Sequence, residues 1–497
     1  MGIDKPRGLQ FNYLHKLHFY YSKKVRFKSL IPFTRVLYIV EKKMPRVLTL
    51  IFLTSIYILP TQANEVILRA HLQSEGNAGG HLGNAVSISG NYALVGAPRD
   101  NENGFHAGAA YLYKFDENQW HLQCKLLAND GQAVDLFGYA LDFQNNRAVI
   151  AAHLSDQYSG FGANQDAGAV YVYEFDENFN CDSPYVKLKS TSAFSAEDEF
   201  GHSVALSGDR IIVGAPKTNI GNKTPGAYYI FQYEDTHWNQ IHLGTCPGVS
   251  DNEDLCGYVV DIDEKNPTTA IVGALSKAYK TTRGGSLMKA GAAYILDIRE
   301  HFGQYRVTNI KNLRSTHPSE NEFFGITVSI SNSIAAVGTA LNGHNHASGL
   351  TSRNGVVHVY HQNSVANSWE LHTKLFSPIP QDYDSFGSQQ LKINRNQLWI
   401  TAPFLDLTTQ EAPGNDFGRV FMYQLQKAYD NVYLEPYFSW NLKKSFTTNT
   451  STDNATAIRF GSSIDVSNQH VLIGSPAFDE LGAEDIGTVF YTSNSYE

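Results

Sequence analysis

The chain has 497 residues, 42% hydrophobic and 12% aromatic, with 40 Gly and only 18% charged residues. This composition allows a large buried core with many turns and favours a β-rich fold. The formal net charge of −9 is uneven: residues 1–63 hold 11 Lys/Arg and 2 Asp/Glu, and the remainder holds 28 basic and 46 acidic residues. The excess of acidic residues in positions 64–497 argues against nucleic-acid binding, which needs a positive surface.

Residues 44–63 have the pattern of a secretory signal peptide. Their uncharged run Val47–Leu59 is shorter than the roughly 20 residues that span a membrane. The basic residues 1–43 have two interpretations. Either translation starts at Met44, or residues 1–43 form a long basic n-region and the apolar run remains as an uncleaved anchor. In both cases we expect residues 64–497 outside the cytoplasm: secreted, periplasmic or on the cell surface.

A short element ending in Gly recurs seven times in residues 64–497, at intervals of 55 to 74 residues. It occurs at His81–Gly83, Leu136–Gly138, Glu199–Gly201, Leu255–Gly257, Phe323–Gly325, Ser385–Gly387 and Arg459–Gly461. A second element, VGAP in its fullest form, ends at Pro98, His153, Pro216, Leu275, Ala340, Pro403 and Pro476. A third, such as GAAYLY, begins at Gly108, Gly168, Gly226, Gly291, Gly355, Gly418 and Gly487. Seven ordered copies indicate a repeat architecture.

Each copy predicts four antiparallel strands, because alternating apolar runs are separated by tight Gly, Asn and Asp turns. The fourth run opens with an aromatic residue in six copies, which we interpret as packing between blades. The seventh copy has no fourth run, but Glu65–Leu72 stands at the matching distance before the first repeat. The sequence therefore predicts an all-β, seven-bladed β-propeller, closed by the N-terminal strand completing the last blade.

The repeats resemble FG-GAP repeats, which form the propeller of integrin α-subunits, and the closest likeness is to a bacterial-type subgroup of that family. The resemblance covers about residues 65–495 and implies the propeller fold more strongly than any function. Integrin-type repeats hold calcium in the hairpin between their first two strands. The richest such hairpin here, Asp261–Pro267, lacks the required Gly and ligand register, so those calcium sites are not expected.

The turns between strands 1 and 2 are minimal, whereas the 2–3 and 4–1 loops are long and varied. Both long sets lie on one face, and loops on a rigid scaffold tend to carry binding residues. The binding-face candidates are Asp100, Glu102, His106, Asp156, Tyr158, Tyr279, Arg283, His344 and His346.

Three features of this face have alternative interpretations. An acidic residue stands three positions before the repeat glycine in five copies and either attracts cations or caps a turn. These residues are Asp135, Asp198, Asp254, Glu322 and Asp384. The segment Asp100–Gly104 with His106 faintly resembles a calcium loop, one residue short, and calcium is the one cofactor we consider. His344 and His346 lack the further ligands of a zinc site, and a solvated loop is the default, so no metal site is assigned.

The four cysteines suit an exported protein. Cys246 and Cys256 flank one 4–1 loop and are the favoured disulfide. Cys124 and Cys181 lie on or near outer strands of adjacent blades, where a second disulfide is feasible.

The sequence contains no G-x-S-x-G, H-E-x-x-H or phosphate-binding Gly loop. We therefore favour a monomeric, secreted or surface-exposed binding or adhesion module that recognises protein or glycan. The alternatives are an extracellular hydrolase with carboxylates at the central channel and a structural envelope protein. Whether the chain is an enzyme stays open.

Overall fold

The computed structural model describes residues 64–68, 72, 79–156, 165–191, 196–248, 253–341, 354–363, 365–379, 384–405, 417–429, 436–448, 458–477 and 486–494. The chain divides into two compact units, Met1–Leu59 and Pro60–Glu497, and all described residues belong to the second. The leader and signal-peptide predictions for residues 1–43 and 44–63 lie outside the described residues. Within the described ranges there is no helix, and so none that is long and apolar enough to cross a membrane.

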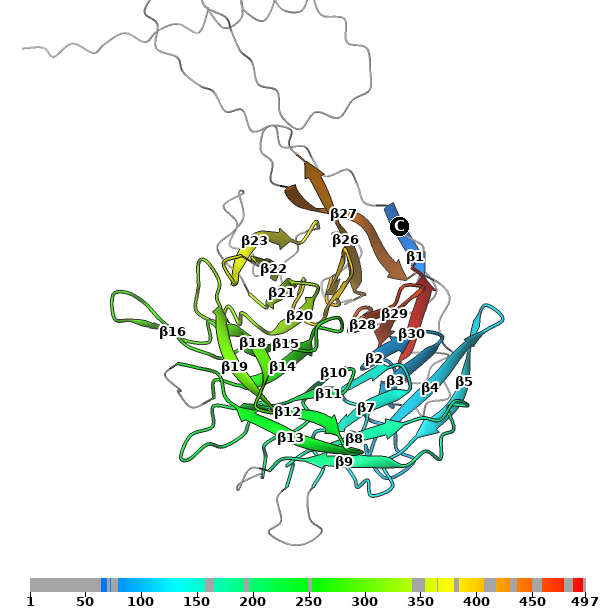
Figure 1. Ribbon diagram of the computed structural model, residues 1–497. Helices are drawn as coiled ribbons and strands as arrows, with labels where there is room; N and C mark the ends of the chain where they lie inside the picture. Colours follow the sequence, from blue (N-terminus) through cyan, green and yellow to red (C-terminus); the bar gives the residue numbers. More distant parts are fainter. Residues whose placement is uncertain are drawn as a thin grey trace, which may run out of the picture. The chain divides into compact units, whose positions relative to one another are not determined.

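The described strands form seven antiparallel sheets that follow one another around a central axis (Figure 1). The innermost strands are β2 (Val86–Ser89), β6 (Leu141–Gln144), β10 (Ser203–Ser207), β14 (Cys256–Ile262), β20 (Thr327–Ser331), β24 (Leu391–Asn394) and β28 (Ser463–Val466). The second strands are β3 (Tyr92–Ala97), β7 (Arg147–Ala152), β11 (Arg210–Ala215), β15 (Thr269–Ala274), β21 (Ile334–Thr339), β25 (Gln397–Ala402) and β29 (His470–Ser475). The protein is a seven-bladed β-propeller, as the repeats predict.

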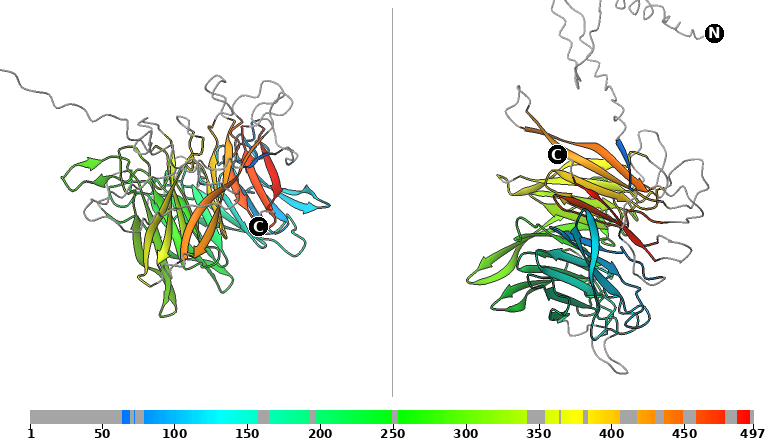
Figure 2. Two further views of the ribbon diagram at one scale, coloured as in Figure 1. Left: turned by 90° about the horizontal axis from the view of Figure 1, so that it is seen from above. Right: turned by 90° about the vertical axis from the view of Figure 1, so that its right-hand side faces the viewer.

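The outer strands complete the blades: in six of the seven sheets the third strand pairs with a fourth. Figure 2 shows the sheets in two further views. The third strands are β4 (Ala109–Asp116), β8 (Ala169–Glu174), β12 (Ala227–Glu234), β18 (Ala292–His301), β22 (Val356–Asn363), β26 (Arg419–Tyr429) and β30 (Thr488–Ser493). The fourth strands are β5 (Gln119–Leu126), β9 (Tyr185–Lys189), β13 (His237–Gly244), β19 (Gln304–Leu313), β23 (Ser368–Phe376) and β27 (Pro436–Thr448). A small hairpin, β16 (Tyr279–Lys280) with β17 (Ser286–Leu287), extends from the 2–3 loop of the fourth blade.

The spacing that recurs within each repeat brings glycines of adjacent blades into backbone contact. A Cβ added to Gly96 in the second element of one blade would overlap the carbonyl oxygen of Gly138 in the next blade. The same contact recurs between Gly474 of the last blade and Gly83 of the first. This position is glycine in five of the seven blades, where it allows a close backbone approach, and it is Ala151 in the second blade and Thr401 in the sixth.

The ring closes differently from the sequence prediction. The seventh sheet contains β28, β29 and β30, while β1 (Asn64–Leu68) pairs in parallel with β27 of the sixth blade. Leu72 does lie beside the last blade, since its N–H donates to Val489 O at 2.8 Å. The prediction that the N-terminal strand completes the seventh sheet is thus not confirmed, although its end reaches that sheet.

The hydrophobic core lies between adjacent blades. One cluster joins Leu472 and Val489 of the last blade to Leu82 and Val95 of the first, so apolar packing also closes the ring. Burial of such side chains is worth roughly 1.5–3 kcal/mol each.

Two disulfides add covalent links. Cys124–Cys181 joins the first two blades with a Cα–Cα distance of 6.1 Å, and Cys246–Cys256 joins the ends of one 4–1 loop with a distance of 5.6 Å.

Candidate binding site in the central cavity

The middle of each innermost strand presents one side chain at an equivalent position, four residues after the repeat glycine in six blades and five in the sixth. We call these seven residues the axial ring. They are Ser87, Asp142, Ala205, Asp261, Ser329, Lys392 and Asp465. Strand alternation explains the pattern, because the residues on either side belong to the apolar packing between blades.

The axial ring links neighbouring blades through hydrogen bonds to backbone. The inner strand is an edge strand, and its N–H groups need partners when they are buried. Five such bonds run from Phe143 N to Ser87 Oγ (3.1 Å), Leu206 N to Asp142 Oδ2 (2.7 Å), Ile330 N to Asp261 Oδ2 (2.8 Å), Ile393 N to Ser329 Oγ (3.1 Å) and Ile88 N to Asp465 Oδ2 (2.8 Å). The last bond joins the seventh blade to the first. Ala205 and Lys392 have no acceptor atom and cannot contribute.

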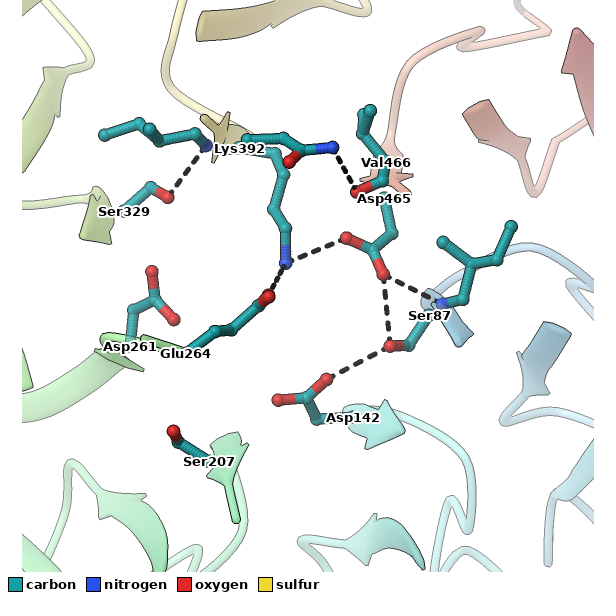
Figure 3. Close-up of polar contacts among 12 residues, drawn as sticks. Ser87, Asp142, Ser207, Asp261, Glu264, Ser329, Lys392, Asp465 and Val466 are labelled. Atoms are coloured by element: carbon teal, nitrogen blue, oxygen red, sulfur yellow. Dashed lines mark hydrogen bonds and ion pairs between the residues drawn. The ribbon is translucent and has the colours of Figure 1, made fainter. Parts of the chain in front are cut away.

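Lys392 is the one cation of the axial ring and gathers carboxylates from other blades (Figure 3). Its Nζ lies 2.9 Å from Glu264 Oε1 and 2.9 Å from Asp465 Oδ1, and a fifth of its side-chain surface stays accessible. Ser87 Oγ lies 3.2 Å from Asp465 Oδ2 and 3.0 Å from Asp142 Oδ1, and its one proton can be donated to either carboxylate. A single ammonium group therefore faces a larger number of acidic groups.

Burial and charge move the pKa values of this cluster in opposite directions. Burial raises the pKa of Asp142 to about 6 and that of Asp261 to about 7, although Lys392 opposes both shifts. The Lys392 charge lowers the pKa of Glu264. Burial lowers the pKa of Lys392, but the surrounding carboxylates outweigh it and hold that pKa well above its usual value. The lysine is thus cationic at all physiological pH values.

Six of the seven axial-ring residues, all but Ser329, form the floor of a cavity of about 520 Å³ on the axis. The cavity lining includes Ser87, Asp142, Asp261, Lys392 and Asp465 but not Glu264, which lies further toward the 1–2 hairpins. Above the floor, the lining continues toward the face of the 2–3 and 4–1 loops. This volume falls within the roughly 300–1,000 Å³ of small-molecule sites.

One side of the cavity wall is aromatic. Tyr139, His202 and Tyr258, each directly after a repeat glycine, come from the second, third and fourth blades. Their ring centroids are 5.6 Å apart between Tyr139 and His202 and 4.6 Å apart between His202 and Tyr258. His202 Nδ1 donates to Tyr258 O at 2.9 Å, and burial lowers the pKa of His202. His153 lies against Tyr139, and burial lowers its pKa to about 3. These histidines are neutral at physiological pH.

The opposite side of the mouth is cationic. Arg99 of the first blade and Arg459 of the seventh both line the cavity and are exposed. Arg99 Nη1 lies 3.2 Å from His81 Nε2, and the Arg459 guanidinium lies over the Phe404 ring at 5.5 Å. Among the described residues, neither guanidinium forms an ion pair with a carboxylate. Their donors remain available to an anionic group.

The loop suggested as a calcium site is held by a lysine instead. Lys125 Nζ lies 2.8 Å from Asp100 Oδ1 and 2.6 Å from Glu102 Oε2. The buried Asp100 carboxylate also accepts from Tyr111 Oη at 2.7 Å. Nearby, His106 stacks on Phe105 with ring centroids 3.9 Å apart. An ammonium group neutralises the carboxylates that calcium would need.

The other binding-face candidates are dispersed. Asp156 Oδ1 accepts from the N–H of Asp166 and braces the 2–3 loop of its own blade. Tyr279 lies in β16, with the Arg314 guanidinium 5.6 Å from its ring centroid, and Arg283 is exposed in the same loop excursion. None of the six described candidates lines the central cavity. The remaining three, Tyr158, His344 and His346, lie outside the described residues.

The acidic residues before the repeat glycines bond within the protein. Asp135 accepts from the N–H of Gln132, Glu322 from that of Ser319, and Asp384 from that of Phe386. Ser190 donates to Asp198, and Lys277 donates to Asp254. The bonds of Asp135, Glu322 and Asp384 to backbone N–H groups are those of turn caps, whereas Asp198 and Asp254 bond to side chains.

The hairpin at the integrin-type calcium position carries three carboxylates with separate partners. In the Asp261–Pro267 hairpin, Asp261 bonds to backbone N–H groups, Asp263 accepts from the N–H of Lys265, and Glu264 pairs with Lys392. The three carboxylates serve separate contacts and do not converge. Among the residues that the structure describes, no group of three or more His, Cys, Asp or Glu side chains is arranged to hold a metal.

The sequence reasoning missed the cavity residues. A sequence signal was available, since both the first position after each repeat glycine and the axial-ring position stand at nearly fixed distances from that glycine. A charged residue at the axial-ring position, such as Lys392 within LKIN, faces the axis rather than solvent. The arginines carry no comparable signal, because surface arginines are common.

Comparisons with known proteins agree with the repeat analysis. A family model described as FG-GAP repeat matches residues 70–113, 120–173 and 191–231, within the first three blades. No curated protein matches the chain. Among solved structures, the crystal structure of Saccharomyces cerevisiae Sqt1 is similar at 10% identity and a TM-score of 0.40, covering 87% of this chain and 99% of that chain.

Proposed function

Because the chain carries FG-GAP repeats and folds as a seven-bladed propeller, we propose that it is an exported recognition module that binds protein or glycan ligands in an adhesive role. The ligand enters the central cavity from the face of the 2–3 and 4–1 loops. The observation that carries this proposal is a cavity with two exposed arginines and three aromatic side chains above a polar floor.

Two features support placement outside the cytoplasm. All four cysteines are paired, which fits an oxidising compartment. The leader pattern of residues 44–63 points the same way. We propose a secreted, periplasmic or surface-attached monomer.

The floor carboxylates favour recognition over hydrolysis. Asp142 Oδ1 and Asp465 Oδ2 both lie within hydrogen-bond distance of the Ser87 hydroxyl, at 3.0 and 3.2 Å, so the two carboxylates are close enough to be considered as a glycosidase-type pair. However, Asp142 also accepts from Phe143 N and Leu206 N, and Asp465 pairs with Lys392. Carboxylates engaged in this way are poorly placed to attack a substrate or transfer a proton to it.

The test is a screen of glycan and protein arrays with the purified full-length chain, with and without calcium. We expect a defined set of ligands whose binding is lost in Tyr258→Ala, at the cavity wall. Phe302→Ala is the matched control, because Phe302 is 96% exposed in a 3–4 hairpin on the opposite face. The proposal fails if no ligand binds, or if both variants bind as the native chain does.

A further inference from the structure

We propose that the central cavity binds an acidic saccharide, a sugar unit with one anionic carboxylate or sulfate group, oriented by the charges of the mouth and floor. This inference rests on the proposed function and names its ligand class. It is argued from three parts of the cavity: the arginine side, the aromatic side and the floor.

The arginine side supplies the anion contact. Arg99 and Arg459 come from neighbouring blades, since the seventh blade adjoins the first through the Gly474–Gly83 contact. Neither forms an ion pair with a described carboxylate, and each is exposed at the mouth. A guanidinium offers paired N–H donors that match the oxygens of a carboxylate or sulfate. Two such groups on adjacent blades favour one anionic substituent at this rim.

The aromatic side supplies a surface for a sugar ring. Tyr139, His202 and Tyr258 follow one another on the second to fourth blades and are partly exposed to the cavity. The half-buried His202 is neutral because burial lowers its pKa, so this side carries no charge of its own. A pyranose ring has an apolar C–H face and polar edges, and it fits a wall that combines ring faces with phenol groups.

The floor determines the orientation. Asp142, Asp261 and Asp465 share one nearby cation, Lys392, so the floor has an excess of negative charge at neutral pH. A ligand anion is repelled from the floor and held at the arginine side. Sugar hydroxyl groups can donate to the floor carboxylates, because ionised carboxylates are acceptors only.

An acidic peptide offers the same anion, but it lacks the density of hydroxyl donors that this floor favours. An acidic saccharide therefore has groups that complement the arginine side, the aromatic side and the floor, whereas an acidic peptide complements the arginine side alone.

The experiment compares ligands that differ only in charge. Isothermal titration calorimetry with the full-length chain would use oligogalacturonate against its methyl ester, and a carrageenan oligosaccharide against the same oligosaccharide after desulfation. We expect at least one acidic member to bind about tenfold or more tightly than its neutral partner, the gain of one charge-assisted contact. Added salt should lower the affinity for the acidic ligand and leave the affinity for the neutral ligand unchanged.

Variants locate the effect. Arg99→Gln and Arg459→Gln should each lower affinity for the acidic ligand about tenfold and leave the neutral ligand unchanged. Arg283→Gln is the control, because Arg283 lies on the same face outside the cavity lining. Equal binding of charged and neutral members, a preference that survives both arginine variants, or selective binding of acidic peptides would overturn the inference.

Different outcomes would reject the acidic ligand class and the proposed recognition site. If neutral glycans or proteins bind and Tyr258→Ala abolishes their binding, the cavity remains the recognition site and only the acidic ligand class is rejected. If Tyr258→Ala and both arginine variants leave every ligand unaffected, the cavity itself is rejected as the site.

Discussion

Replacing Lys392 with Met tests whether the axial ring is held together by its one cation. The change removes the ammonium group that lies 2.9 Å from both Glu264 and Asp465, and leaves the aliphatic stem in place. Breaking a buried ion pair by removing one partner costs about 3–5 kcal/mol. Because a fifth of the Lys392 side chain is accessible, we expect a smaller loss of about 2–4 kcal/mol at pH 8.

The loss should depend on pH in a definite direction. The folded-state pKa values of Asp142 and Asp261, about 6 and about 7, lie above the unfolded value of about 3.9. Their contribution to stability is therefore fully present below that unfolded value and is lost as pH rises through 6 to 7. Lys392 lowers both pKa values, so the variant should lose stability more steeply over pH 5–8. The difference between native and variant chains should be smallest near pH 5.

Urea denaturation at pH 5 and pH 8 measures this difference. Lys265→Met is the matched control, because Lys265 is exposed in a 1–2 hairpin and such surface changes usually stay within about 0.5 kcal/mol. Adding Glu264→Gln to the Lys392 variant should recover part of the stability at pH 8 by removing one unpaired carboxylate. An equal loss at both pH values, or no recovery in the double variant, would show that the ammonium group does not balance these carboxylates.

Two further changes test the closure of the ring and the covalent links. Gly474→Ala places a Cβ on the Gly83 carbonyl oxygen and should lower the melting temperature sharply or prevent folding. Gly285→Ala, where the atom nearest to the added Cβ is the partly exposed Thr281 hydroxyl oxygen at 3.2 Å, should have a much smaller effect in the same thermal scan. The Cys124–Cys181 disulfide closes 57 residues, so a double alanine variant should lose about 4 kcal/mol in urea unfolding of the unreduced protein; a loss below about 1 kcal/mol would mean that the loop is already constrained by blade packing.

Much of the fold could be predicted because the repeat sets both strand phase and blade spacing. The glycines at Gly96 and Gly138 recur at fixed offsets, and the backbone contact between them needs no side chain. Alternation within a run such as VSIS then settles which residues face the axis. These properties are local: the glycine of the first element recurs in all seven copies, and that of the second element in five.

The closing strand was predicted less well because pairing partners are a tertiary property. The spacing before the first repeat matches that of a fourth strand, yet β1 pairs with β27. β27 is 13 residues long and offers an extended outer edge to which β1 adds in parallel. Nothing in the spacing distinguishes that edge from the edge of β30.

The candidate site was missed for a similar reason. Long loops drew attention to Asp100 and Glu102, whose carboxylates are held by Lys125. The pairing of Lys392 with Glu264 joins residues 128 positions apart, and it depends on a hairpin from one blade reaching the inner strand of another. Composition gives no sign of such a contact.

The cavity changes character from floor to mouth, and this decides where ligand specificity can arise. At the floor, Asp142 and Asp465 bond to the backbone of the next blade, so substitutions there alter ring closure as well as charge. One layer higher, His202 still donates to the backbone of the next blade. Arg99 and Arg459, at the mouth, make no described ion pair, so they can vary without cost to the ring. We therefore expect substitutions of the mouth residues to change which ligands bind, while the negative charge of the floor stays the same.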